Sequence, residues 1–262
     1  SGIAALAMLN LMENFPLSET GHNTSRTLHT LIESKKLAYA DMLRFVADPR
    51  FAKAPVAGIL NKDYARERAK LVDTAKAADI VPPGKPPNPG HDTTYLCVVD
   101  KDGNMVSYIQ SNYAGFGSGL VPDGCGFVFQ NRGGLFTLDA ANPNALAGRK
   151  RPLHTIIPGF MARGDERIAF GIMGGWNQSQ AHAQFVSNVV DHKLNIQAAL
   201  EVPRFTKLTF EGVDVEMERR MPEAVRKELT ALGHKITVRG DFTQSVGGGQ
   251  AVDRPARQHD GV

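Results

Sequence analysis

A proline-rich segment divides the chain into two parts with different hydrophobic patterns. Residues 81–90 read Val-Pro-Pro-Gly-Lys-Pro-Pro-Asn-Pro-Gly and hold five of the 15 prolines in the 262-residue sequence. Proline fixes φ and has no backbone N–H, so this segment can form neither a helix nor a central strand. We predict an exposed linker that ends at residues 91–94, His-Asp-Thr-Thr, with separate secondary structure on its two sides.

Before the linker, apolar residues recur at helical intervals. Residues 3–9 are almost all apolar and predict a helix that is already under way, which suggests a fragment with sequence missing upstream. Apolar side chains at i, i+3 and i+4 predict a second helix over residues 28–46, after the candidate N-caps Asn23 and Thr24. A third helix is expected over residues 63–78, which are rich in Ala, Lys, Arg and Glu.

After the linker the apolar period falls to two, which is typical of strands. Residues 95–100 and 105–110 flank Lys-Asp-Gly-Asn, and Asp-Gly between two such runs predicts a β-hairpin. Further strands are expected at 126–130, 156–162, 167–173, 207–210, 213–217 and 235–239, with helices at 178–191 and 222–233. This order predicts a mixed α and β fold with its chemistry in the second half.

Charge and composition exclude several classes of protein. The 30 Lys+Arg and 27 Asp+Glu give a formal net charge of +3, and basic residues cluster only at 149–151, so no nucleic-acid surface is predicted. No run approaches the ~20 apolar residues of a membrane span. Cys97 and Cys125 allow at most one disulfide, and the spacing of the eight histidines predicts no metal; no cofactor is expected either.

The join between the linker and the hairpin, Asp92-Thr93-Thr94, carries a candidate nucleophile. A threonine at a strand start can attack a carbonyl when cleavage of the chain frees its amine, because that amine then serves as the general base. The alternative is that Thr93 and Thr94 are a β-branched pair that merely opens a strand. The residues alone leave both interpretations open.

Three other segments are candidates for binding an anion. Gly174-Gly175-Trp176 lies between a predicted strand and a predicted helix, where free backbone N–H groups suit an oxyanion hole, although the glycines could simply permit a turn. Residues 247–249 are three glycines, for which a flexible loop is the favoured interpretation. Arg132 and the basic segment 149–155 could each bind a carboxylate or be solvated loops.

Together these segments resemble the gamma-glutamyltranspeptidase family of N-terminal-nucleophile hydrolases. Each motif is weak alone, but many occur in the family's order. They are Leu-Met-Glu-Asn-Phe at 11–15, Ala-Tyr-Ala-Asp at 38–41, Asp-Pro-Arg-Phe at 48–51, Thr-Thr-Tyr at 93–95, Val-Val-Asp-Lys-Asp-Gly-Asn at 98–104, Phe-Gly-Ser-Gly at 116–119, Lys-Arg-Pro at 150–152, Met-Gly-Gly at 173–175, Ala-Ala-Leu at 198–200, Pro-Arg-Phe at 203–205 and Thr-Gln-Ser at 243–245.

The resemblance implies an α+β fold, the four-layer αββα sandwich of the N-terminal-nucleophile hydrolases, of which this chain covers only the C-terminal half of the usual family length. It also implies a precursor that cuts itself between Asp92 and Thr93. Residues 1–92 would then be the C-terminal part of the large subunit. Residues 93–262 would be the small catalytic subunit, which begins at the nucleophile.

The resemblance also assigns roles to single residues. Thr93 matches the nucleophile, Ser111 the second hydroxyl that hydrogen-bonds it, and Gly174 and Gly175 the oxyanion hole. Thr94 neighbours the nucleophile. The pair His154 and Thr155 matches two residues, usually serines, that hold the glutamyl α-carboxylate.

The chain also departs from the family pattern. Tyr113 replaces a typical asparagine, although Asn112 is adjacent, and Arg132 replaces a glutamine or glutamate. Leu135 stands where an acid pairs with the substrate α-amino group, and residues 136–151 are too few for the usual lid. The family arginine that binds the α-carboxylate belongs to the upstream half. Asn-Arg-Gly at 131–133 resembles the branch with cephalosporin acylase-like members, and an arginine in the pocket would favour an extra carboxylate.

The implied activity is cleavage of γ-glutamyl amides such as glutathione through a threonyl acyl-enzyme, with an amino acid, a dipeptide or water as acceptor. An open site favours hydrolysis over transfer. The alternatives are a glutaryl or cephalosporin-type amide acylase with the same mechanism, and a non-catalytic homologue or fragment. Without its upstream half the chain is expected to expose apolar helix residues such as Leu6, Leu9 and Met12. The sequence leaves the compartment open; the resemblance implies a periplasmic or secreted protein whose export segment would belong to the upstream half.

Overall fold

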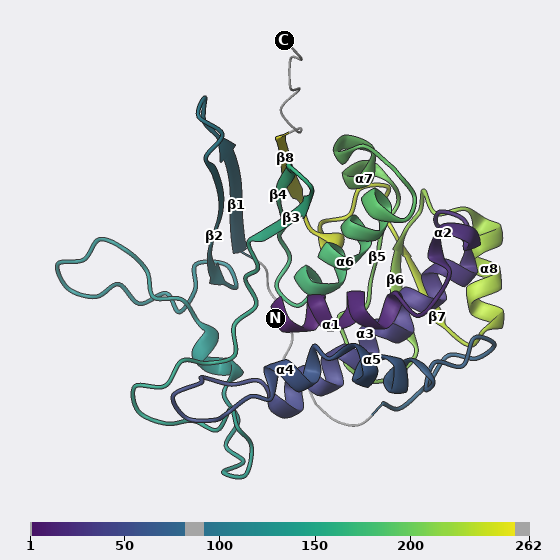
Figure 1. The fold of residues 1–262 in the computed structure, drawn as a ribbon. Coiled ribbons are helices and arrows are strands. Elements are labelled where there is room, and N and C mark those ends of the chain that lie inside the picture. The colour runs from purple at the N-terminus through teal and green to yellow at the C-terminus, as the bar shows by residue number, and fades with distance from the viewer. Residues whose placement is uncertain (1, 82–91, 255–262) are drawn as a thin grey trace.

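The computed structural model describes residues 2–81 and 92–254, so the predicted linker lies outside the described residues except for Val81. Helices come first along the chain (Figure 1). They are α1 (Gly2–Met12), α2 (Leu17–Thr20), α3 (Ser25–Phe45), α4 (Val56–Ile59) and α5 (Lys62–Ala69). In the described part of the chain, no helix is long and apolar enough to cross a membrane.

The longest helix, α3, confirms the predicted second helix. The Thr24 side chain caps it by accepting a hydrogen bond from the Thr27 N–H. Helix α5 ends at Ala69, nine residues before the predicted end. The Asp73 carboxylate accepts the Ala75 N–H at 2.9 Å, and such a local side-chain turn competes with helix. Met12 is buried, contrary to expectation, whereas Leu6 is exposed.

Thr93 lies on the predicted hairpin, formed by β1 (Asp92–Val99) and β2 (Met105–Tyr113). In its turn the Asp100 carboxylate accepts the N–H groups of Asp102 and Asn104, both at 2.9 Å. The face turned away from the rest of the molecule exposes apolar side chains. These are Leu96, Val98, Val106 and Tyr108.

The hairpin packs against a second β layer. That layer is the antiparallel sheet of β3 (Gly159–Arg163), β4 (Glu166–Ile172) and β8 (Gly249–Arg254). Gly171 permits this close approach, because a Cβ there would lie 2.4 Å from the Tyr95 ring. Helix α6 (Asn177–Val190) packs on the sheet through Phe185, which contacts Phe170 (Figure 1).

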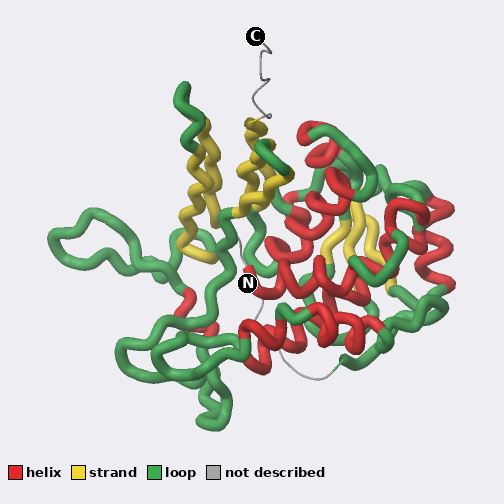
Figure 2. Tube along the Cα trace, in the orientation of Figure 1, coloured by secondary structure: helices red, strands yellow, loops and turns green. Residues whose placement is uncertain are grey.

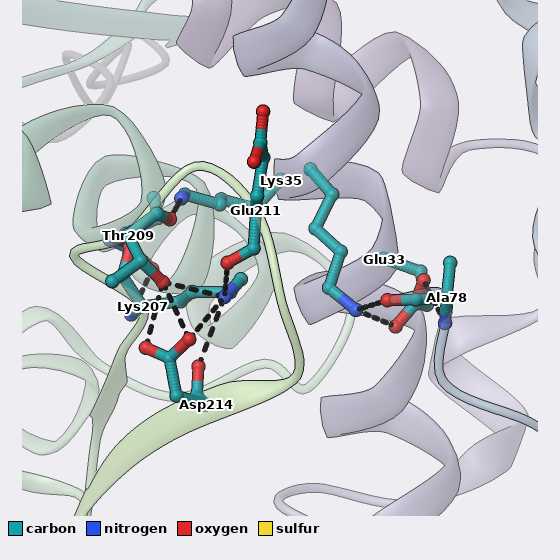
Figure 3. A network of polar contacts seen from close by, with 9 residues as sticks. Glu33, Lys35, Ala78, Lys207, Thr209, Glu211 and Asp214 are labelled. Atoms are coloured by element: carbon teal, nitrogen blue, oxygen red, sulfur yellow. Dashed lines mark hydrogen bonds and ion pairs between the residues drawn. The ribbon is translucent and has the colours of Figure 1, made fainter. Parts of the chain in front are cut away.

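Residues 196–239 contain a separate small sheet, which is covered by α3 and α8 (Figures 1 and 2). Its elements are α7 (Ile196–Glu201), β5 (Phe205–Thr206), β6 (Asp214–Glu218), α8 (Glu223–Ala231) and β7 (Lys235–Arg239). The predicted strand at 207–210 is wrong. The chain turns there instead, and the buried Lys207 ammonium bonds four oxygens of residues 209–214 (Figure 3).

Two more predictions fail, and the one disulfide that the sequence allowed is not formed. Residues 126–130 form no strand: they lie in a long loop where Phe127 and Phe129 are exposed and face no core. Cys97 and Cys125 are both free thiols. The glycines at 247–249 are not a flexible loop, because they lead into β8 and pack on Met173.

Candidate active site

Two hydroxyls face each other across the hairpin. Thr93 on β1 pairs with Ser111 on β2, and the Thr93 Oγ1 donates a hydrogen bond to the Ser111 Oγ at 2.9 Å. Thr93 is half-buried, which leaves one side open to a reactant. Among the described residues, no imidazole or carboxylate hydrogen-bonds the Thr93 hydroxyl. A base for Thr93 would therefore have to come from its own amine after cleavage.

The bond between Asp92 and Thr93 lies at an irregularity of the hairpin. Asp92 pairs with Tyr113 and Thr93 with Ser111, so Asn112 is bulged out of the ladder. Tyr113 has φ of +80°, which is uncommon for a residue with a Cβ. Its N–H donates to the Ser111 Oγ at 2.9 Å instead of to a strand partner. The bulge thus adds a second donor to the Ser111 oxygen that accepts the hydrogen bond from Thr93.

Arg132 supports this pair of hydroxyls from the interior. It begins the short 3₁₀ helix η1 (Arg132–Leu135) and is completely buried. Its guanidinium donates to the Ser111 carbonyl and to the Ser111 Oγ, both at 2.9 Å, and to the Thr155 Oγ1 at 3.0 Å. Asn131 fixes this position, since its N–H bonds the Asn112 carbonyl at 3.1 Å and its side chain accepts the Ala114 N–H.

The charge of Arg132 is not neutralised by a carboxylate anywhere in the described part of the chain. Burial lowers its pKa to about 10, so the guanidinium stays charged at neutral pH. The ring of Tyr113 lies 5.2 Å from the guanidinium carbon. Because Ser111 accepts from both Arg132 and Thr93, this positive charge lies one hydroxyl from the candidate nucleophile and favours a negative charge on its oxygen.

The candidate acyl-binding pair lies beside Arg132. Thr155 is fully buried and takes part in the network through its hydroxyl, whereas His154 lies at the surface. Burial of part of the ring and the charge of Arg132 lower the pKa of His154 to about 4, so the imidazole is neutral at neutral pH. A cavity of about 280 Å³ lies next to His154, between residues 46–49 and 151–154.

The glycine pair forms a turn that leaves two donors free. Gly174 and Gly175 have φ of +123° and +55°, and their carbonyls accept the N–H groups of Asn177 and Gln178 in the first turn of α6. Within residues 2–81 and 92–254, the N–H groups of the two glycines donate no hydrogen bond. Two such N–H groups can bind an oxyanion.

Contacts on both sides hold this turn. On one side the Met173 N–H donates to the Gly248 carbonyl at 2.9 Å, and Gly247 approaches so closely that a Cβ there would lie 1.9 Å from the Met173 oxygen. On the other side Trp176 shares a buried apolar cluster with Tyr113, the residue next to Arg132. The glycine pair and the hydroxyl network are therefore joined through Trp176 and Tyr113.

The structure thus brings together most of the predicted site residues but not all of them. Thr94 is exposed on the outward face of the hairpin, opposite to Thr93. Leu135 is buried and supplies no acid. Arg132 is occupied by protein hydroxyls and a carbonyl, so it does not offer an open surface to the extra carboxylate expected from the sequence.

The sequence did not reveal an ionic clamp beside the site. Asp48, whose carboxylate is buried, accepts hydrogen bonds from the side chains of Arg50 and Arg151 and from the Arg151 N–H at 2.9 Å. These bonds hold the pKa of Asp48 well below its usual range. Arg151, in the predicted anion-binding segment 149–155, therefore binds the Asp48 carboxylate of the protein itself. The family motif at 48–51 was the sequence signal that could have pointed to this clamp.

A second group missed by the sequence is a possible set of metal ligands. His29, Glu33 and His234 are buried with their ligand atoms within 4.8 Å of one another. His29 and His234 hydrogen-bond at 2.7 Å, and the Lys36 ammonium pairs with Glu33 at 2.7 Å. Lysine already supplies the cation here. Sequence spacing could not show this group, because His234 lies 205 residues from His29 in the sequence.

Comparison with known proteins agrees with this geometry. The family model for gamma-glutamyltranspeptidase matches residues 1–262. The glutathione hydrolase-like YwrD proenzyme of Bacillus subtilis is 32% identical, over 96% of this chain and 48% of the relative. Acylase ACY 1 proenzyme of a Pseudomonas species is 34% identical, over 90% of this chain and 42% of the relative.

The cephalosporin acylase from Bacillus halodurans gives a structural comparison. It is 40% identical with a TM-score of 0.86, over 98% of this chain and 46% of that chain. This similarity confirms the predicted α+β fold of the N-terminal-nucleophile hydrolase type. The chain spans about half the length of the relatives it matches. It belongs to the gamma-glutamyltranspeptidase family, whose members include glutathione hydrolase and acylase proenzymes.

Proposed function

We propose that the protein is an N-terminal threonine amidohydrolase that cleaves γ-glutamyl amides such as glutathione after self-cleavage between Asp92 and Thr93. The observation that carries this proposal is the network in which the Thr93 hydroxyl bonds Ser111 and Ser111 bonds the buried Arg132. A relative named glutathione hydrolase-like supports the choice of substrate. We also propose that an upstream half completes the large subunit, since the relatives are about twice as long.

The proposed reaction proceeds through an ester on Thr93. The freed Thr93 amine takes the hydroxyl proton, and the oxygen attacks the amide carbon. The oxyanion that forms binds the free N–H groups of Gly174 and Gly175. The C–N bond then breaks, and the leaving amine receives the proton. Water repeats the attack on the ester, releases the acid and restores the Thr93 hydroxyl.

We propose that His154 contacts the far end of the acyl group and that the fully buried Thr155 supports this part of the site from behind. Thr155 is held by Arg132, and the neutral His154 can donate or accept a hydrogen bond without adding charge. Asn112 and Tyr113 form the bulge beside Thr93 and would border the acyl group.

A second candidate function is a glutaryl or cephalosporin-type amide acylase with the same mechanism. The buried Leu135 favours it, because this position offers no carboxylate to a substrate ammonium. The similarity to a cephalosporin acylase over nearly the whole chain points the same way. Glutaryl differs from γ-glutamyl only in lacking the α-amine, so a direct comparison of the two acyl groups separates the candidates.

In either case we expect hydrolysis to exceed transfer, because residues 136–151 are too few to form a lid against water. Initial rates with and without glycylglycine test this point. Product formed mainly by the dipeptide would contradict it.

The test combines mass and rate measurements. Intact mass and N-terminal sequencing should give a fragment that begins Thr93-Thr94-Tyr95-Leu96, and the cleaved protein should hydrolyse γ-glutamyl or glutaryl p-nitroanilide. Thr93→Ala should abolish both cleavage and hydrolysis, whereas Thr230→Ala on α8, an exposed threonine, should change neither. An uncut chain that persists when the upstream half is supplied would sink the proposal and favour a non-catalytic homologue.

A further inference from the structure

The part of the chain before Thr93 reaches the turn that carries the glycine pair. Tyr39 lies on α3, and its hydroxyl donates a hydrogen bond to the carbonyl oxygen of Trp176. Trp176 directly follows Gly175. The bond joins residues 137 positions apart, on opposite sides of the proposed cleavage site.

The Tyr39 side chain is held rigidly where it makes this bond. It is 1% exposed and packs against Phe210 at a ring-centroid distance of 5.5 Å, and Phe210 in turn meets Trp176 edge-on at 5.1 Å. The ammonium of Lys35 bonds the Thr209 carbonyl at 2.6 Å (Figure 3) and lies 4.3 Å from the centre of the Tyr39 ring. Burial raises the pKa of Tyr39, so its hydroxyl remains a donor.

The glycine turn needs restraint from outside. Glycine has no side chain and adopts many backbone conformations, so two in succession do not fix the direction of their N–H groups. The Met173 side of the turn is held by Gly247 and Gly248, which belong to the same segment as the turn itself. The Trp176 side is held by Tyr39, which belongs to the segment before Thr93.

We infer that Tyr39 is a positioning residue for the oxyanion site: its hydroxyl fixes the Trp176 carbonyl and thereby directs the N–H groups of Gly174 and Gly175. This inference rests on the proposed function. The large subunit would then contribute to the chemical step through Tyr39, even though Tyr39 touches no reacting atom.

Tyr39→Phe tests the inference by removing one hydroxyl while keeping the ring against Phe210 and Lys35. Loss of a whole oxyanion donor lowers kcat roughly 10²–10³-fold. A misdirected donor should lower kcat by less, about tenfold, with KM changed less than about twofold. The matched control is Tyr64→Phe on α5. Its hydroxyl bonds the Asp41 carboxylate at 3.0 Å within the same segment, so kcat should be unchanged.

A second measurement separates positioning from general loosening of the site. A boronic acid that carries the preferred acyl chain forms a tetrahedral adduct with the Thr93 oxygen and places an oxygen at the oxyanion position. Tyr39→Phe should weaken boronate binding by the same factor as kcat and leave binding of the free acid product unchanged.

Three outcomes would overturn the inference: equal kcat in Tyr39→Phe and wild type, a rise in KM with kcat unchanged, or a loss of folding in Tyr39→Phe that Tyr64→Phe does not share. These outcomes differ from failure of the proposed function. In that case the wild-type protein itself would neither cleave before Thr93 nor hydrolyse either anilide.

Discussion

Two regions of the molecule bury a cation, and they treat its charge differently. Around Arg132 the partners are two hydroxyls and a carbonyl, with no carboxylate. Around Lys36 and Lys207 the partners include the carboxylates of Glu33 and Asp214 (Figure 3). A buried charge without a counter-ion is costly to fold, and such a group is a candidate for function. A paired one stabilises its local structure: Lys36 and Glu33 both lie on α3, and Lys207 and Asp214 lie at the two ends of the turn that leads into β6.

The largest effect should follow from removing the unpaired charge. Arg132→Met should lower kcat/KM by about 10²–10³, because the Thr93 oxygen loses the positive charge transmitted by Ser111. The free energy of unfolding should stay the same or rise, since an apolar chain of similar size replaces a buried ion. Steady-state kinetics and thermal melts on the same samples measure both quantities. Arg132→Lys keeps the charge but not the forked geometry, so its kcat/KM should lie between those of the wild type and Arg132→Met. Large destabilisation of Arg132→Met with a normal kcat would show that Arg132 serves stability rather than catalysis.

Removing a paired charge should lower the free energy of unfolding and leave the kinetics unchanged. Lys207→Met leaves Asp214 and Thr209 without their ammonium partner, so the free energy of unfolding should fall by about 1–2 kcal/mol, less than for a fully buried pair because Asp214 is half-exposed. kcat and KM should match those of the wild type. Urea unfolding gives the first value and the anilide assay the second. A tenfold loss of kcat without destabilisation would place Lys207 with Arg132 in the functional class.

Asp48 lies between these extremes, since its carboxylate is buried but the two arginines that bind it are largely exposed. Asp48→Asn should release residues 149–151 and raise KM about three- to tenfold with little change in kcat, as expected when ground-state and transition-state binding are lost together. Asp41→Asn is the matched control, because Asp41 pairs with Arg68 inside the first segment. Equal KM in both variants would show that the clamp does not serve the site.

The effect that is smallest at neutral pH, and grows only in acid, concerns His234. Burial and the nearby charge of Lys36 lower the pKa of His234 to about 3, so the folded protein keeps this imidazole neutral. In the unfolded chain this imidazole is protonated near pH 6.5. Its contribution to stability is therefore complete above that pH and falls as the pH drops toward 3, by up to about tenfold in the folding constant per pH unit. His234→Gln should flatten this slope in urea titrations between pH 6.5 and 4. An unchanged slope would assign the acid sensitivity to other groups.

Local patterns predicted the parts of the fold that depend on neighbouring residues. The Asp-Gly turn predicted the hairpin, the apolar spacing predicted α3, and a helix was also expected where α6 lies. Residues 207–210 failed because a buried ammonium organises the chain into a turn, which overrides the strand propensity of the segment. The strand prediction for residues 126–130 failed because Phe127 and Phe129 are exposed and contact each other rather than a core.

The site shows the same limit. The family resemblance singled out Thr93, Ser111 and the glycine pair, and a hydrogen bond joins the first two directly. The buried state of Arg132 could not be read from the sequence, since an arginine between Asn131 and Gly133 equally fits an open anion site. The contribution of Tyr39 was equally hidden, because its partner is a backbone carbonyl 137 residues away.

The contacts of Tyr39 with Trp176 and of Asp48 with Arg151 both cross the bond between Asp92 and Thr93. A cut at that bond would therefore yield two chains that already lie docked, and neither would have to find the other by diffusion. The two pieces would need no encounter step after the cut, because the effective concentration of one near the other is set before the chain is broken. Assembly would be concentration-independent for a protein made as one chain, and a bimolecular reaction for the same two pieces made separately.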